Sequence, residues 1–543
     1  MKRLIKLLFV YIAFVGCTTN KKVDLIVYNA RVYTVDSAFS IQEAFAVKNG
    51  IFIDIGSSKH ILDSYIAKEK IDAEGKAVFP GFYDAHGHSF LLAEYFQQVD
   101  LVGCKSVQDL VNRLQQYRKK YPEKKWIVGG GWDQSLWPDK KMPHRDTLDK
   151  YFPDVPVFLN RTDYHAAVVN SEALKIAQID ESTTVEGGRI EKDSTGRITG
   201  ILVDNAMALV SQYIPSAKED NMLSILRQAQ DSLFSVGLTS MVDAGLSEEE
   251  LDLLKKYYQS DSLKIRNYAM IFAEPHNIQK YIRDDIYESD RLTIRAIKMM
   301  SDGALGSKGA CMLDNYENDT IRGFLLHPKE EFEKALTILS KSNYQVAIHA
   351  IGDSSNRMLL DLYGKMDVKD KRWRIEHAQV VHPSDFVKFR TYGVLPSIQP
   401  THATSDMKWL YERIGKDRAK SAYAYKELLK WYGKVAIGSD FPVEHFNPLY
   451  GFHAAVARQD AAGNPQEGFQ MENALTREEA LRGMTIWAAY SCFQEKKRGS
   501  IEKGKDADFV MLEEDLMTAP TERLRDIKVL RTVVAGETVY TKR

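Results

Sequence analysis

The chain has 543 residues and a formal net charge of −1. A chain of this length is expected to form roughly three or four domain-sized units. It contains no long block of Lys and Arg, which excludes a protein that holds nucleic acid mainly through clustered cations. Its widely spaced cysteines, Cys17, Cys104, Cys311 and Cys492, form no CxxC pair, so any metal is expected on His, Asp, Glu or Lys.

The N-terminus has the pattern of an export signal. Three cations among residues 2–6 precede an apolar run over residues 7–15, which is short for a membrane-spanning helix. Gly16-Cys17 resembles a bacterial lipoprotein cleavage box, although Phe14 stands where Leu is usual. We therefore expect residues 1–17 to be a signal peptide with a lipobox, and the exported chain to be anchored on a bacterial membrane surface through lipidated Cys17. An ordinary secretory signal with an incidental Cys is the alternative.

Both ends of the remaining chain are rich in short β-type segments. Residues 23–78 include Asn49-Gly50, the signature of a two-residue hairpin. Residues 499–543 likewise contain short β-type segments separated by turn residues. These two segments are predicted to form one composite β-sandwich.

The middle of the chain alternates apolar runs with helical stretches, which is typical of parallel βα units. Eight runs predict an α/β fold, a (β/α)8 TIM barrel over residues 79–103 and 231–498. The first gap is too long for a loop, so residues 104–230 are predicted to be an inserted α+β subdomain that covers the active site. The eight runs span residues 77–85, 238–244, 265–272, 294–300, 345–350, 372–377, 394–399 and 434–439.

Ionisable side chains stand at the ends of these runs, where such barrels carry their chemistry. His86 and His88 follow the first run at i, i+2 spacing, which places both imidazoles on one face of an extended strand. An HxH pair alone is a weak signal, but two of the other 11 histidines, His349 and His377, also stand at strand ends. Together with Lys298 and Asp440, they favour a metal centre over separate structural roles.

Lys298 has two interpretations. A Lys between apolar residues is costly to bury in its charged form. It could reach outward and pair with Asp302, or burial could lower its pKa from about 10.4 and leave an amine that carbon dioxide can carboxylate. The residues themselves do not choose between these interpretations.

Several segments together resemble the amidohydrolase superfamily, in particular its amidohydrolase-3, YtcJ-like branch. The resemblance covers nearly all of residues 23–543. It is carried by GFYDAHGH (81–88), GGGWDQSLWP (129–138), RTDYHAAVVNSEAL (161–174), GGRIEKDSTGRITGIL (187–202), IKMMSDGALGSKGA (297–310), IHAIGD (348–353), RIEHAQ (374–379), QPTHATSDMKW (399–409) and GSDFPV (438–443).

The resemblance implies a barrel with one or two divalent ions. His86, His88 and Asp440 would bind one ion, and His349 and His377 a second, with Lys298, N6-carboxylated, as the bridge. Zinc is the metal expected for this imidazole-rich set, with iron, manganese or nickel as alternatives.

The same resemblance implies hydrolysis of a non-peptide C–N bond in a small amide, N-acyl or N-formyl substrate, with Asp440 as the proton shuttle. A homodimer is compatible with the sequence. The alternatives are a deaminase, an ester, lactone or phosphotriester hydrolase, and a solute-binding lipoprotein without catalysis. The candidate substrate contacts are Trp132, Asp133, His165, Asn170 and His402.

Overall fold

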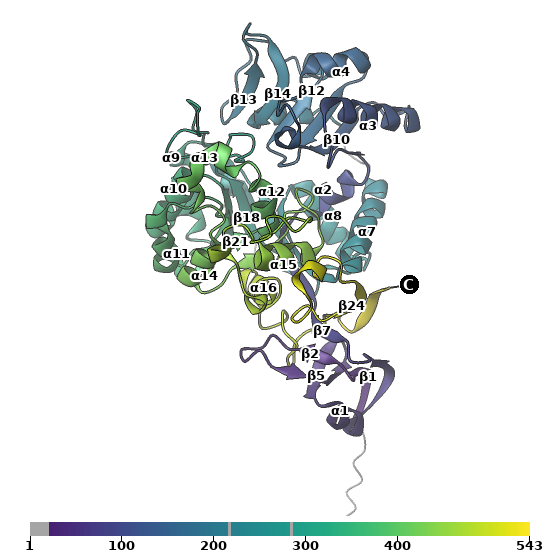
Figure 1. Cartoon of the computed structure of the whole chain (residues 1–543). Coiled ribbons are helices and arrows are strands. Elements are labelled where there is room, and N and C mark those ends of the chain that lie inside the picture. Colours follow the sequence, from purple (N-terminus) through teal and green to yellow (C-terminus); the bar gives the residue numbers. More distant parts are fainter. Residues whose placement is uncertain (1–20, 216–218, 283–285, 367, 543) are drawn as a thin grey trace, which may run out of the picture.

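The computed structural model describes residues 21–215, 219–282, 286–366 and 368–542, so the predicted signal peptide and Cys17 lie outside the described residues. A barrel stands in the middle of the molecule, with the inserted segment above it and a β-sandwich below it (Figure 1). Among the helices of the described segments, none combines the length and the apolar character that crossing a membrane requires.

Eight parallel strands in sequence order form the barrel, which confirms the predicted fold class. Gly87 and Phe441 form a parallel bridge between the first strand and the segment after the last one. The amide of Asp440 donates to the carbonyl of His86 at 2.7 Å, which brings the two ends of the sheet together. The strands are β8 (Phe82–Gly87), β15 (Leu238–Leu246), β16 (Arg266–Phe272), β18 (Leu292–Met300), β19 (Gln345–Ala350), β20 (Arg374–His377), β21 (Leu395–Ile398) and β22 (Ala436–Ile437), and β17 (Tyr287–Glu288) pairs with β18.

The first predicted run is wrong as a single strand, because it breaks at Gly81. Residues before the break form β7 (Ala77–Pro80), which belongs to the sandwich, and only β8 enters the barrel. A side chain at residue 81 would collide with Thr239, since a Cβ there would lie 2.2 Å from its Oγ1. The chain therefore changes sheets where glycine allows close approach to β15.

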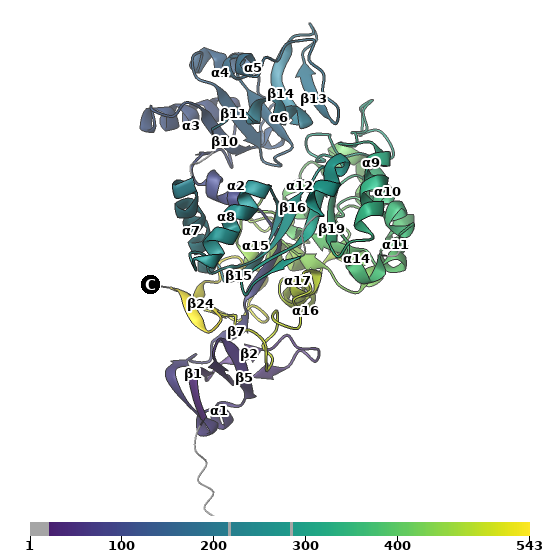
Figure 2. The ribbon, with the colours of Figure 1, turned by 180° about the vertical axis from the view of Figure 1, so that it is seen from behind.

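Helices surround the barrel, and one helix closes its lower end, as the reverse view shows (Figure 2). Ala488 and Ala489 of α17 pack with Tyr83 and Tyr268 in the interior cluster. The helices are α2 (Ser89–Tyr95), α7 (Glu219–Ser235), α8 (Glu248–Gln259), α9 (Lys329–Leu339), α10 (Asp353–Gly364), α11 (Phe386–Tyr392), α12 (Pro400–Asp406), α13 (Leu410–Ala419), α14 (Tyr425–Tyr432), α15 (Pro448–Ala457), α16 (Arg477–Gly483) and α17 (Ile486–Ser491).

Two sheets from both ends of the chain form the sandwich. The rings of Phe45, from the N-terminal segment, and Phe509, from the C-terminal segment, lie 5.0 Å apart in its core. Asn49 and Gly50 both have positive φ and make the predicted hairpin. One sheet has the order β5 (Ile51–Gly56), β4 (Ala44–Lys48), β1 (Lys21–Tyr28), β6 (Tyr65–Asp72), beside α1 (Ser58–Ser64), and the other has β25 (Glu537–Thr541), β24 (Val529–Val534), β23 (Phe509–Leu512), β7, β2 (Arg31–Tyr33), β3 (Ile41–Gln42).

The inserted segment has its own six-stranded sheet. This sheet begins at Val99, before the predicted boundary at residue 104, because β9 pairs with β10. Most of helix α7 falls within the predicted insertion, but the helix packs on α2 and β15 of the barrel. The strands in sheet order are β13 (Gly188–Lys192), β14 (Ile198–Asp204), β12 (Ala166–Val169), β11 (Val157–Arg161), β10 (Ile127–Trp132) and β9 (Val99–Asp100), and the helices are α3 (Val107–Lys120), α4 (Arg145–Tyr151), α5 (Ser171–Ile176) and α6 (Asn205–Ser211).

Candidate metal centre

A cavity of about 670 Å³ lies between the carboxyl ends of the barrel strands and the insertion. The rim of the barrel supplies its floor, and residues 161–165 of the insertion line it as well. All six predicted metal ligands border this cavity: His86, His88, Lys298, His349, His377 and Asp440.

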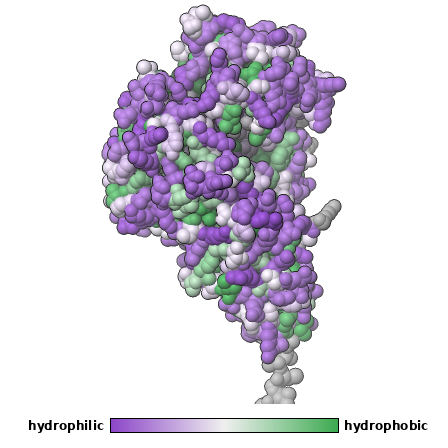
Figure 3. Space-filling view, viewed as in Figure 1, coloured by the Kyte–Doolittle hydropathy of each residue, from purple (hydrophilic) through white to green (hydrophobic). Residues whose placement is uncertain are grey.

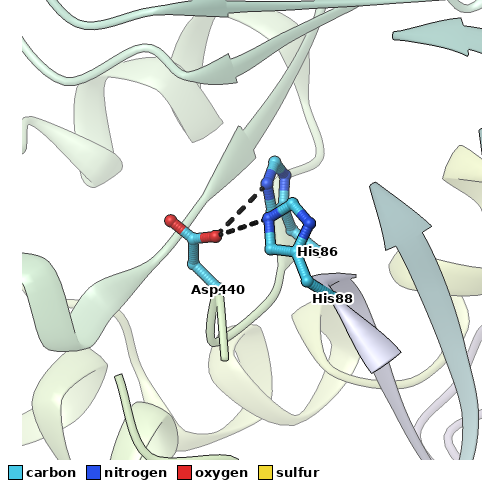
Figure 4. Close-up of side chains that lie close together, drawn as sticks. All are labelled: His86, His88 and Asp440. Atoms are coloured by element: carbon cyan, nitrogen blue, oxygen red, sulfur yellow. Dashed lines mark hydrogen bonds and ion pairs between the residues drawn. The ribbon is translucent and has the colours of Figure 1, made fainter. Parts of the chain in front are cut away.

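His86, His88 and Asp440 form the first group of candidate ligands. One carboxylate oxygen, Oδ1 of Asp440, lies 3.5 Å from Nε2 of His86 and 3.1 Å from Nε2 of His88 (Figure 4). His86 comes from the end of β8, His88 precedes α2, and Asp440 follows β22. The side chains converge because β8 and the segment after β22 are neighbours at the closure of the barrel.

A second group shares Asp440 and includes His377 and His402. Nε2 of His402 lies 3.5 Å from Oδ2 of Asp440. The resemblance implied His349 as the partner of His377, and the His349 ring centroid does lie 4.6 Å from that of His377. Nε2 of His349 lies 3.4 Å from the carbonyl oxygen of Gly303, whereas His402, predicted as a substrate contact, completes the compact group.

A buried carboxylate orients His86. Its Nδ1 lies 2.5 Å from Oε2 of Glu376, and Arg374 donates to both oxygens of that carboxylate, at 2.6 and 2.9 Å. The proton of His86 therefore belongs on Nδ1, which leaves the Nε2 lone pair facing Asp440. Nε2 of His86 is buried and finds no hydrogen-bond partner among the described residues, which fits an atom that binds a cation.

His377 is oriented in a similar way. Its Nδ1 lies 2.8 Å from Oε1 of Gln399, so that Nε2 is free for a cation. His377 and Asp440 also have left-handed φ angles of 72° and 63°, which non-glycine residues rarely adopt. Such strained positions concentrate at functional sites. His377 ends β20 and Asp440 follows β22, and both side chains border the cavity.

The charge states of these groups suit a divalent cation. Burial lowers the pKa of His86 to about 4 and holds the pKa values of His349 and His377 well below their usual range. Burial alone would raise the pKa of Asp440, but nearby His86 and His88 hold it well below its ordinary value. Neutral imidazoles and an ionised carboxylate are the forms that bind metal, so these residues fit a divalent ion.

Lys298 does not pair with Asp302. Its side chain is 2% exposed, and burial lowers its pKa. The Asp302 carboxylate instead accepts hydrogen bonds from the amides of Cys311, Ile351 and Gly352. Gly245 gives the lysine stem room, since a Cβ there would lie 3.2 Å from Cγ of Lys298. The structure therefore favours an inward Lys298 whose amine is easily neutralised.

Asp133 and His165 reach the cavity from the insertion, as predicted for substrate contacts. Nδ1 of His165 lies 2.6 Å from Oδ1 of Asp204. Arg161 donates to Asp133 at 2.6 Å and to Asp163 at 2.5 Å, and both carboxylates keep this buried guanidinium charged. Arg161 was not among the predicted site residues, although a cation two residues before Asp163, at the end of a short strand, is a visible signal.

Trp132 and Asn170 were predicted as substrate contacts, and this prediction is wrong, because neither side chain borders the cavity. The Trp132 indole is fully buried and donates to the carbonyl of Leu159 at 2.8 Å. Asn170 caps α5 by accepting from the amide of Ala173, and it donates to the carbonyls of Phe152 and Val155. Their polar atoms are used inside the insertion, so both residues stabilise this segment instead of touching a substrate.

Eight parallel strands with a rim of imidazoles and a shared carboxylate define the class of metal-dependent barrel hydrolases. A sequence profile described as "Amidohydrolase family" matches residues 69–540, and the chain therefore belongs to this family. This result confirms the resemblance drawn from the motifs.

Similar proteins cover almost the whole chain. The protein YtcJ of Bacillus subtilis is 30% identical over 94% of this chain and 98% of its own length. An "N-substituted formamide deformylase" of Arthrobacter pascens is 27% identical over 95% of this chain and 98% of its own length. The crystal structure of an uncharacterized metal-dependent hydrolase from Pyrococcus horikoshii has a TM-score of 0.74 at 27% identity, and covers 92% of this chain and 99% of that one.

Proposed function

We propose that this hydrolase cleaves the C–N bond of a small, uncharged amide, N-acyl or N-formyl compound. One or two bound divalent ions would assist the reaction, and zinc is the expected metal. The observation that carries the proposal is the buried, unpartnered Nε2 of His86, which faces the shared carboxylate of Asp440. The similarity to an N-substituted formamide deformylase supports cleavage at nitrogen over cleavage of an ester.

Asp440 is the group that moves the proton. A divalent ion bound here would lower the pKa of a water molecule to about 7 and would polarise the substrate carbonyl. Asp440 stays ionised and reaches His88 and His402 through its two oxygens, so it can accept a proton from water on one side of the cavity. It can then pass the proton to the departing nitrogen, which would otherwise leave as an unstable anion.

The walls of the cavity favour an apolar substituent. Leu91, Val102, Leu136 and Phe272 border it and are unusually exposed for large hydrophobic residues. Green, hydrophobic side chains likewise gather beside the hollow below the insertion (Figure 3). Such walls bind an apolar group without the desolvation cost that a polar group would carry.

The charges of the cavity disfavour an anionic substrate. Its cationic side chains in the described part of the chain are Arg161, Lys298 and Lys408. Two carboxylates hold Arg161, burial favours the neutral form of Lys298, and the Lys408 ammonium lies 3.6 Å from Asp460. No lysine or arginine of the described cavity wall is therefore left free to receive a substrate carboxylate.

A matched pair of substrates tests the proposal. We expect the metal-loaded protein to release formate from N-formyl-2-phenylethylamine with a kcat/KM at least about tenfold above that for N-formylphenylalanine, because the second carries an added carboxylate. Formate assays measure both values, and protein stripped by phenanthroline should be inactive until zinc is returned. Turnover of phenylethyl esters with no turnover of any amide in a broader panel would contradict the proposal.

Lys298 offers a test of the carbamate bridge. We expect Lys298→Ala to lose most activity, and acetate or propionate at high concentration to restore part of it by supplying a carboxylate at the vacated position. Activity assays with chloride at matched ionic strength control for salt effects. A variant that no short carboxylic acid improves would argue against a carboxylated Lys298.

A further inference from the structure

We propose that a second kind of metal site lies outside the cavity, where His276, His327 and Glu331 bind a divalent transition ion of the zinc type. One ligand atom from each of these side chains lies within 4.8 Å of the others. His276 is on the 3-10 helix η2 (Pro275–Tyr281), which follows β16, and Glu331 is in the first turn of α9. None of the three borders the active-site cavity.

The distances between the three side chains suit a common ion. Oε2 of Glu331 lies 3.5 Å from Nδ1 of His327 and 4.0 Å from Nδ1 of His276. An ion between them would replace these direct contacts with bonds of about 2.0–2.2 Å to nitrogen and oxygen. Two imidazoles and one carboxylate form a three-ligand set that zinc accepts, with water in the remaining position.

A fourth residue, Glu274, fixes the orientation of His327. Its Oε2 lies 2.5 Å from Nε2 of His327, on the side of the ring away from Glu331. This contact places a ring proton on Nε2 and leaves Nδ1 as the nitrogen that faces Glu331. A carboxylate on the second nitrogen of a ligating imidazole is the usual arrangement at metal sites.

The site joins elements that also hold the cavity. His327 directly follows Leu326, whose amide donates to the carbonyl of Ser301 and whose carbonyl accepts from Asn205 of the insertion. An ion on His327 would therefore connect η2 and α9 to the segment that links barrel and insertion. Its ligands do not touch the metal centre, so its occupancy can be measured separately from catalysis.

Zinc titration of the metal-loaded protein tests this site. After gel filtration, calorimetry should show one more zinc equivalent bound by the wild type than by His276→Ala or His327→Ala. His276 has a side chain that is 58% exposed, so its removal should leave the fold intact. Glu274→Gln should keep the equivalent but weaken its binding by roughly 10- to 100-fold, because only the orientation of His327 is lost.

His60→Ala is the matched control, since His60 is an exposed imidazole 3.0 Å from one carboxylate, Asp54. It should bind as many zinc equivalents as the wild type, and amide turnover should be unchanged in the His276 variant. Equal zinc stoichiometry in wild type and His276→Ala would overturn the proposed site, whatever the activity of the main centre proves to be.

Discussion

We expect Asp440→Asn to lower kcat by roughly 10²- to 10⁴-fold while the protein keeps its fold. The amide is nearly the same size as the carboxylate, and the backbone bond from residue 440 to the carbonyl of His86 does not depend on the side chain. What is lost is an ionised oxygen that can take a proton between His88 and His402. Single-turnover and steady-state assays on metal-loaded protein measure the effect.

Glu495→Gln is the control for this substitution, because it also neutralises one carboxylate in the chain. Glu495 pairs with Arg372 and does not border the cavity. The control should retain wild-type turnover and metal content. If Asp440→Asn instead worked at near-normal rates, Asp440 would be ruled out as the proton shuttle.

The second large effect concerns stability. We expect Glu376→Ala to reduce the free energy of unfolding of the metal-free protein by about 3–5 kcal/mol, because it leaves the guanidinium of Arg374 buried without its partner. Both side chains are 0% exposed, and the other hydrogen-bond partners of Arg374 in the described segments are neutral groups, including the carbonyl of Ala85 and the hydroxyl of Ser397. Urea unfolding followed by fluorescence measures the change.

A double substitution separates charge from packing. Arg374→Met combined with Glu376→Leu removes both charges and should recover much of the loss, since apolar residues of similar volume often replace a buried ion pair without cost. The double variant should still bind metal more weakly, because His86 has lost its orienting carboxylate. A double variant no more stable than Glu376→Ala would show that the ion pair itself is not the source of the effect.

The barrel could be predicted because its signals are local. Each strand is a short apolar run, and the carboxyl ends of parallel strands meet at one rim, so His86, His349 and His377 could be placed together. The break at Gly81 was missed, because apolar residues lie on both sides of it and the choice between two sheets is made by partners far away in sequence.

Other features of the site depend on how segments far apart in the sequence pack together. His402 stands on α12, so its approach to Asp440 depends on how a helix leaves β21, which the spacing of residues does not show. Arg374 and Glu376 lie two residues apart on strand β20, and they are buried as an ion pair only because the closed barrel surrounds them. Trp132 lies in a segment that resembles the family, but its indole serves the packing of the insertion.

The composite sandwich has a consequence for how the protein is made. Strand β23 lies between β24 and β7, so residues 509–541 complete a sheet that residues 31–80 begin. A growing chain that has already finished its barrel still carries β7 with an open edge and the apolar face of Phe45 uncovered. The sandwich can therefore close only after residues 509–541 have been synthesised and have met the N-terminal strands.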